Sequence, residues 1–131
     1  MLDIDHFKSI NDGHGHLMGD RVLSALGELL KQSVGEAGST VARYGGEEFA
    51  ILLPHATPAL AQEVAERVRL RTKGLKIRHK QTNEVVLTLT LSAGVAAHQR
   101  GEDAPAWIAR ADKALYQAKE SGRDRVALAA A

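Results

Sequence analysis

The nine residues from Ala42 to Ala50, ARYGGEEFA, contain the pattern that decides the fold. A pair of glycines separates two short apolar segments, residues 40–44 and 49–53, which predicts two antiparallel strands joined by a tight turn. Glycine permits the sharp bend and lets the backbone lie close to a ligand. The turn also carries two acids, Glu47 and Glu48. On their own they are compatible with an ordinary charged turn.

Hydrophobic periodicity on both sides of this hairpin predicts alternating strands and amphipathic helices. Asp5 is well placed to cap the first helix, and residues 11–19, which hold three glycines, predict a loop. The order of elements predicts an α+β fold with a mixed, mainly antiparallel central sheet flanked by helices, of the palm or ferredoxin-like kind. The expected helices are residues 7–10, 20–34, 57–72 and 104–121, and the expected strands are 2–5, 40–44, 49–53, 75–80, 85–96 and 125–128.

Composition limits the classes of protein to consider. A chain of 131 residues predicts one domain, residues 1–131, and the short opening strand suggests an N-terminal truncation. Lys and Arg number 17 against 16 Asp and Glu, so no basic excess points to nucleic acid as a partner. The chain has no cysteine, which excludes disulfides and thiolate metal sites. Without a signal peptide or a membrane-length apolar run, we expect a cytoplasmic protein with no membrane partner.

A second acidic pattern opens the chain, where Asp3 and Asp5 flank Ile4. Alternate side chains of a strand share a face, so both carboxylates are expected to point the same way, with Ile4 toward the core. Carboxylates at a strand end form a hard-oxygen site that suits Mg²⁺. Taken alone, this pattern more often marks a solvated strand end.

Together these patterns resemble the GGDEF domain family, the catalytic domains of diguanylate cyclases, here with the spelling GGEEF. The resemblance covers nearly the whole chain and implies a fold of the palm or nucleotidyl-cyclase type. Members usually carry a further helix and a D-x-L-T-G-L-x-N-R segment before the first strand, and an upstream regulatory domain. The matching blocks are Asp3 to Lys8, Ile10 to Asp12, Gly15-His16, Gly19-Asp20, Arg43 to Phe49, Ser92 to Val95, Ala111 to Lys119 and Gly122-Arg123.

The resemblance implies that two GTP molecules are joined across a homodimer. The 3′-hydroxyl of one GTP attacks the α-phosphate of the other, and the products are cyclic di-GMP and pyrophosphate. Such a displacement uses metal ions that bind the attacking and leaving oxygens. By resemblance, Asp3, Glu47 and the Ile4 carbonyl hold two Mg²⁺ ions, with Mn²⁺ as an alternative. Glu47 and Glu48 are the catalytic acids, and Glu48 lies near the attacking hydroxyl as a base or an electrostatic partner.

The resemblance also implies residues that bind the nucleotide. Lys8, Lys119, Arg123 and the amides at the helix start near Phe7 would bind phosphates, because a helix N-terminus favours anions. Without the resemblance, Lys119 and Arg123 would be interpreted as cations that stabilise a helix C-terminus.

Asn11 and Asp20 would recognise guanine by the same resemblance. A carboxylate can accept hydrogen bonds from N1–H and the 2-amino group of guanine together, and adenine lacks both donors. Without the resemblance, Asp20 is an acid in the first turn of a helix and Asn11 is a loop residue.

One departure from the family concerns regulation. Many members carry an inhibitory R-x-x-D motif before the hairpin, but the matching residues Glu36 to Ser39 lack both the Arg and the Asp. An inhibitory product site is therefore not expected, and any bound cyclic di-GMP should contact Asn11 and Asp20 in the nucleotide pocket. Two alternatives remain: a catalytically silent module that binds GTP or cyclic di-GMP, and a different palm-type nucleotidyl cyclase or polymerase.

Overall fold

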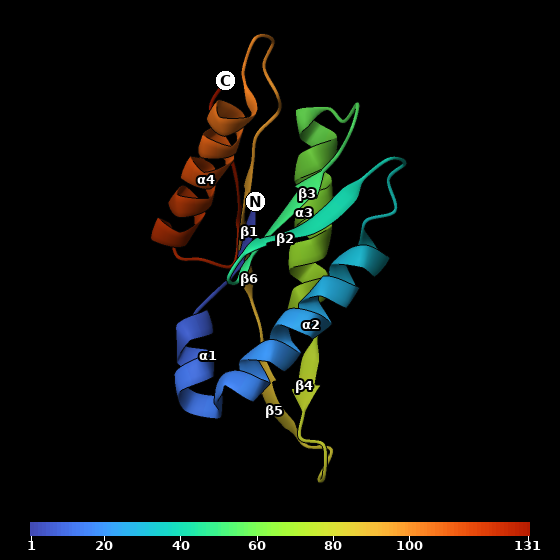
Figure 1. Cartoon of the computed structure of the whole chain (residues 1–131), viewed down its shortest axis with the longest axis vertical. Coiled ribbons are helices and arrows are strands. Elements are labelled where there is room, and N and C mark those ends of the chain that lie inside the picture. Colours follow the sequence, from blue (N-terminus) through green and yellow to red (C-terminus); the bar gives the residue numbers. More distant parts are fainter.

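The computed structural model describes residues 1–131 and contains a five-stranded sheet, a two-stranded sheet and four helices (Figure 1). This architecture confirms the predicted α+β fold. The helices are α1 (Phe7–His14), α2 (His16–Ser33), α3 (Pro58–Lys73) and α4 (Ala104–Glu120). The strands are β1 (Leu2–Ile4), β2 (Thr40–Gly45), β3 (Glu48–Leu52), β4 (Lys76–Arg78), β5 (Val85–Thr88), β6 (Leu91–Val95) and β7 (Val126–Leu128).

The larger sheet has the strand order β2-β3-β1-β6-β7, with the short strand β1 at its centre. Only the β6–β7 pair is parallel, so the sheet is mixed and mainly antiparallel, as predicted. The β2–β3 hairpin forms at the glycine pair, and Gly46 has a φ of 50° in its turn. Because β1 pairs with both neighbours, Asp3 lies opposite Glu48 on one side and Ser92 on the other.

The two faces of this sheet bury different residues because side chains alternate along a strand. Leu2, Ile4 and Phe49 point to the face covered by α2 and α3, where they join Leu26, Leu30, Val64 and Val68 in the hydrophobic core. Asp3, Glu48 and Gly94 therefore point to the opposite face. The helix α4 packs on that face over β6 and β7.

Gly94 sets how closely α4 approaches the sheet. A β-carbon added at this position would overlap the backbone carbonyl of Ala111 and the backbone amide of Leu115. The buried positions on the inner face of α4 near this point are also small, namely Ala111, Ala114 and Ala118. Helix and strand are thus in contact through backbone atoms.

The region predicted as a loop is helical. The helix α1 continues to His14, and after a single break at Gly15, with a φ of 87°, α2 begins at His16. A glycine-rich stretch suggested a flexible connection, but Gly19 instead allows two helices to meet. A β-carbon there would overlap the Asn11 side chain of α1.

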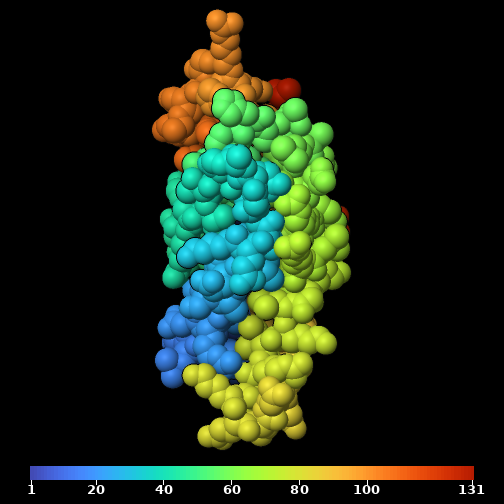
Figure 2. Space-filling view, turned by 90° about the vertical axis from the view of Figure 1, so that its right-hand side faces the viewer, coloured from blue at the N-terminus to red at the C-terminus, as the bar shows by residue number.

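Two further predictions were wrong. The segment 85–96 is not one strand: β5 pairs with β4 in a separate small sheet, and β6 enters the central sheet. Figure 2 shows the β4–β5 hairpin, in yellow, projecting at one end of the molecule. In addition, the residue that precedes α1 is His6, with a φ of 58° and no side-chain cap, so Asp5 does not cap this helix.

No helix of the structure has both the length and the apolar character needed to cross a membrane.

The close contact at Gly94 predicts a large loss of stability on adding one methyl group. We expect Gly94→Ala to lower the free energy of unfolding by at least about 2 kcal/mol, since backbone atoms must move to accommodate it. Urea unfolding followed by circular dichroism measures this. Gly27→Ala is the matched control, because its β-carbon would meet only Phe49, at 3.8 Å, within a helix. The control should be neutral or more stable by up to about 1 kcal/mol, and equal effects of the two changes would contradict the packing argument.

Candidate active site

Acids from separate parts of the sequence meet at the end of β1. Asp3 is buried, with 4% of its surface exposed, and Glu48 is its pairing partner at the first position of β3. The Asp3 carboxylate forms an ion pair with Lys119 of α4. The sheet register and the α4 packing thus bring together three of the predicted site residues.

Three buried side-chain oxygens in the chain have no hydrogen-bond partner, and all three belong to predicted site residues. They are Asp3 Oδ1, Asn11 Oδ1 and Glu48 Oε2. Buried polar atoms in folded proteins are nearly always hydrogen-bonded, so an unpaired acceptor calls for an explanation such as a ligand or an ion. The clustering of all three on predicted residues points to a binding site rather than to poor packing.

The acids also perturb one another. Burial raises the pKa of Asp3 above its ordinary value, against the opposing effect of Lys119, and Glu47 and Asp5 raise it further. Burial likewise raises the pKa of Glu48, and the nearby charges of Asp112 and Asp3 add to this. Such perturbed acids, held close together by the fold, are typical of functional sites.

The residues present fit a magnesium site that is completed by substrate. The structure contains no group of three or more His, Cys, Asp or Glu side chains that could hold a metal ion by themselves. Mg²⁺ is commonly bound by only one or two carboxylates together with water and substrate phosphates. Asp3, with its unpaired buried oxygen, is a hard donor of this kind. Glu47 lies close enough to affect the pKa of Asp3.

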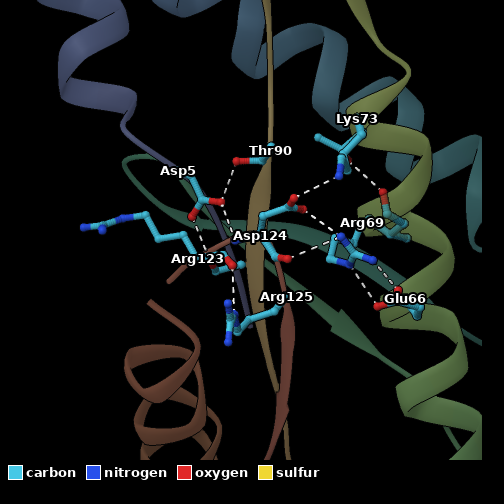
Figure 3. A network of polar contacts seen from close by, with 11 residues as sticks. Asp5, Glu66, Arg69, Lys73, Thr90, Arg123, Asp124 and Arg125 are labelled. Carbon is cyan, nitrogen blue, oxygen red and sulfur yellow. Dashed lines mark hydrogen bonds and ion pairs between the residues drawn. The ribbon is translucent and has the colours of Figure 1, made fainter. Parts of the chain in front are cut away.

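The predicted phosphate-binding groups lie on two elements beside these acids. The helix α1 begins at Phe7, two residues after Asp5, and Lys8 is exposed in its first turn. Lys119 lies near the C-terminus of α4 and pairs with Asp3, while Arg123 follows in the turn after that helix. The guanidinium of Arg123 makes no hydrogen bond or ion pair within the chain, and Figure 3 shows its side chain directed away from the neighbouring polar network.

The predicted guanine-binding residues lie on neighbouring helices. Asp20 of α2 lines a cavity of about 330 Å³ with Leu23, Ser24, Arg43 and Phe49. Asn11 of α1 is not among the residues that line this cavity, although its buried side-chain oxygen is unpaired beside Gly19. A larger apolar cleft, of about 810 Å³, contains none of the predicted site residues.

Sequence reasoning missed the role of Asp5. Its carboxylate accepts hydrogen bonds from Thr90 Oγ1 and Ser92 Oγ, both at 2.7 Å, and from the Asp124 amide at 3.0 Å (Figure 3). It therefore ties the end of β1 to β6 and to the turn after α4, instead of capping α1. The two hydroxyl donors are far from Asp5 in the sequence, so only the strand register could have indicated them.

Asp112 was also missed as a neighbour of Glu48, whose pKa its charge raises. It lies on α4 seven residues before Lys119, which is two helical turns, so both side chains lie on the same side of the helix. The seven-residue spacing of Asp112 and Lys119 could have indicated from the sequence that both side chains face the same site.

Two arginines of α3, Arg67 and Arg69, form ion pairs within the chain. Arg67 bonds to Glu36 at 3.0 Å, and Arg69 bonds to Glu66 and Asp124. Arg67 thus joins α3 to the segment that lacks the motif, and Arg69 joins α3 to the turn after α4.

The family model described as "Diguanylate cyclase, GGDEF domain" matches residues 1–125. The chain belongs to the GGDEF domain family of diguanylate cyclases. It is 44% identical over 126 residues to diguanylate cyclase VdcA of Vibrio cholerae, covering 96% of this chain and 37% of VdcA. It is 42% identical over 129 residues to diguanylate cyclase DgcP of Pseudomonas aeruginosa, covering 98% of this chain and 19% of DgcP. The chain therefore spans well under half of these relatives.

Solved structures of GGDEF domains share the fold. The GGDEF domain of DgcB from Caulobacter crescentus, solved in complex with c-di-GMP, superposes with a TM-score of 0.91 at 36% identity over 97% of this chain and 74% of that chain. The active GGEEF domain of a diguanylate cyclase from Vibrio cholerae gives 0.86 at 36% identity, over 99% and 80%. The predicted family and fold class of this GGDEF domain are confirmed.

The raised pKa of Glu48 predicts that its charge destabilises the fold. An acid whose pKa is raised by folding contributes stability below its ordinary pKa, and this stability is lost as the pH rises through the raised value. We therefore expect Glu48→Gln to be more stable than the wild type at neutral pH. The advantage should disappear at about pH 4, where the wild-type acid is protonated.

Urea unfolding at several pH values measures this difference. Glu63→Gln, a change of an exposed acid on α3, is the control and should alter stability little at any pH. A Glu48→Gln protein that is less stable than the wild type at pH 7 would show that the carboxylate is not under strain from burial and like charges.

Proposed function

We propose that this GGDEF domain is the catalytic domain of a diguanylate cyclase that condenses two GTP molecules into cyclic di-GMP and two pyrophosphates. The observation that carries the proposal is that all three unpaired buried oxygens belong to residues expected to meet metal, substrate or guanine. The named activities of the relatives support the same reaction.

The proposed nucleotide would extend from the α1–α2 contact to the acids at the end of β1. Asn11 and Asp20 would accept hydrogen bonds from the guanine edge. The amides at the start of α1, together with Lys8, Lys119 and Arg123, would bind the triphosphate, since a helix N-terminus and cations both favour an anion. Lys119 would exchange part of its contact with Asp3 for the phosphates.

Asp3, Glu47 and the Ile4 carbonyl would hold two Mg²⁺ ions, or Mn²⁺. When bound, these ions would stabilise the negative charge that develops on the attacking and leaving oxygens. Glu48 would accept the proton of the 3′-hydroxyl as a bond forms from the 3′-oxygen to the α-phosphorus. The bond from that phosphorus to the bridging oxygen breaks, and pyrophosphate leaves. The raised pKa of Glu48 suits it to accept a proton better than an exposed Glu would.

Each domain would bring one GTP, so the reaction requires a homodimer in which two sites face each other. In the full-length protein, an upstream regulatory domain would control this pairing. We place the protein in the cytoplasm, where GTP is available. The bound DgcB structure supports cyclic di-GMP as a ligand, and we propose that it occupies the nucleotide pocket of this chain, at Asn11 and Asp20.

One observation favours a silent binding module as the second candidate. Lys119 neutralises Asp3, a proposed metal ligand, within the chain itself. If this pair persisted with GTP bound, the domain would hold the nucleotide without turning it over.

A turnover assay separates the two candidates. We expect the chain, incubated with GTP and Mg²⁺, to release cyclic di-GMP and pyrophosphate with a specific activity that rises with protein concentration. Glu48→Ala should lose activity by at least about 100-fold, within the range of general-base catalysis, and removal of Mg²⁺ by EDTA should abolish it. Glu63→Ala is the matched control on an exposed acid. Retained GTP binding without product, even when two domains are linked covalently, would favour the silent module.

Guanine recognition predicts a loss of base discrimination in Asp20→Ala. We expect the ratio of GTP to ATP affinity, measured by calorimetry, to fall roughly 10- to 100-fold because the acceptor for two guanine donors is gone. Affinity for cyclic di-GMP should fall in parallel. Asp12→Ala, which removes an exposed acid from α1, should change neither. A variant with unaltered base preference would refute the assignment of Asp20.

A further inference from the structure

The turn after α4 has an unusual backbone. Gly122, Arg123 and Asp124 have φ values of 121°, 64° and 47°, so three successive residues lie at positive φ. Gly122 ends the helix in the ordinary way: its amide bonds to Lys119 O at 3.3 Å and the Arg123 amide bonds to Ala118 O at 3.0 Å. Positive φ is uncommon for residues with side chains, although Asp tolerates it better than most, so two such residues in succession call for support from the surrounding structure.

The contacts that support this backbone are made by Asp124. Its carboxylate bonds to Arg69 Nη1 at 2.7 Å and to Lys73 Nζ at 3.0 Å, both from α3. Burial opposes ionisation of Asp124, but the hydrogen bonds from Lys73 and Arg69 outweigh it and lower its pKa. Its carbonyl accepts a further hydrogen bond from Arg69 at 3.3 Å. Figure 3 shows these side chains directed toward one another between α3 and the turn.

The other side of the turn is fixed by Asp5. The Asp124 amide donates to Asp5 Oδ2 at 3.0 Å, and Thr90 and Ser92 hold the same carboxylate. Asp124 is therefore bonded through its amide to the end of β1 and through its side chain to α3. Arg123, directly before it, is held through its backbone: its amide donates to Ala118 O and its carbonyl accepts from Arg125 Nε, both at 3.0 Å. Its guanidinium is free of partners within the chain.

We propose that Asp124 is a positioning residue: it locks the left-handed turn and thereby presents the Arg123 guanidinium to the phosphates of GTP. The proposal rests on the proposed function, since it requires the nucleotide site described above. Asp124 is bonded to Asp5, and Asp5 is two residues from both Asp3 and Phe7, where α1 begins. An arginine whose backbone is already fixed at this position costs less ordering on binding than an arginine on a flexible loop.

The side-chain chemistry separates this role from a general effect of charge. Asn adopts positive φ readily and still accepts a hydrogen bond, whereas Ala does neither. Asp124→Asn should therefore keep the turn and most of the affinity for GTP. Asp124→Ala should free the turn from α3 and weaken GTP binding.

Calorimetry with Mg²⁺ and GTP, and NMR titration with guanosine, test the proposal on the whole chain. We expect Asp124→Ala to weaken GTP binding about tenfold, like Arg123→Ala, and to leave guanosine binding unchanged because guanosine has no phosphate. A variant that carries both Asp124→Ala and Arg123→Ala should bind GTP no more weakly than Arg123→Ala alone, because Asp124 acts through Arg123. Additive losses, an equal loss for guanosine, or no loss in Arg123→Ala would each overturn the proposal.

Glu36→Ala is the matched control. It breaks the Arg67–Glu36 pair, which also joins α3 to a loop acid of similar exposure: 25% for the Glu36 side chain and 29% for the Asp124 side chain. It should leave GTP binding unchanged, and a tenfold loss would show that any broken pair on α3 has the same effect.

A measurement without nucleotide distinguishes failure of this proposal from failure of the proposed function. Hydrogen exchange at the residue 124 amide, which bonds to Asp5, should be at least tenfold faster in Asp124→Ala and nearly unchanged in Asp124→Asn. Equal protection in all three proteins would refute the lock whether or not GTP binds. Faster exchange in a chain that binds no GTP would retain the lock but remove its proposed purpose.

Discussion

The pairing of β1 between β3 and β6 is the constraint on which the site depends. This strand has three residues, and its central position leaves both of its edges occupied. Leu2 and Ile4 are buried in the core between the sheet and the helices α2 and α3. Because side chains alternate, burial of these two residues forces Asp3 to the opposite face, beside Glu48. A register shift of one residue would turn Asp3 into the core and Leu2 and Ile4 away from it. The burial of Leu2 and Ile4 therefore fixes where the Asp3 carboxylate lies.

The contact of α4 with that same face supplies the remaining charges. Gly94 lets the helix rest on the strand, and the helix then carries Asp112 and Lys119 over the acids. The helix cannot move outward without opening a gap at Ala111, Ala114 and Ala118. The position of a cation at the site is therefore set by small residues that have no chemical role of their own.

Sequence patterns predicted the sheet, the α3 and α4 helices and the hairpin because each follows from local periodicity or turn chemistry. The resemblance to the GGDEF family, rather than any local pattern, implied that Asp3 and Glu48 share a site, and their pairing became visible only in the sheet register. The errors arose where tertiary contacts overrule local preference. Glycines at 13, 15 and 19 suggested a loop, yet Gly19 serves the contact between two helices. Asp5 suited a helix cap locally, but Thr90, Ser92 and Asp124 reach it through the fold.

The two aspartates of the opening motif show how physical context separates a structural acid from a functional one. Asp3 and Asp5 are almost equally buried, with 4% and 5% of their surfaces exposed. Asp5 receives three hydrogen bonds, so its desolvation is compensated within the chain. Asp3 retains an unpaired oxygen, has like charges nearby and a raised pKa. Since burial is the same, the difference lies in the partners: the fold completes the coordination of Asp5 and leaves that of Asp3 open to a ligand. Asp3, with one oxygen paired to Lys119 and the other without a partner, is held in place by the core residues Leu2 and Ile4. Asp5, whose carboxylate is fully hydrogen-bonded, anchors the turn that carries Arg123.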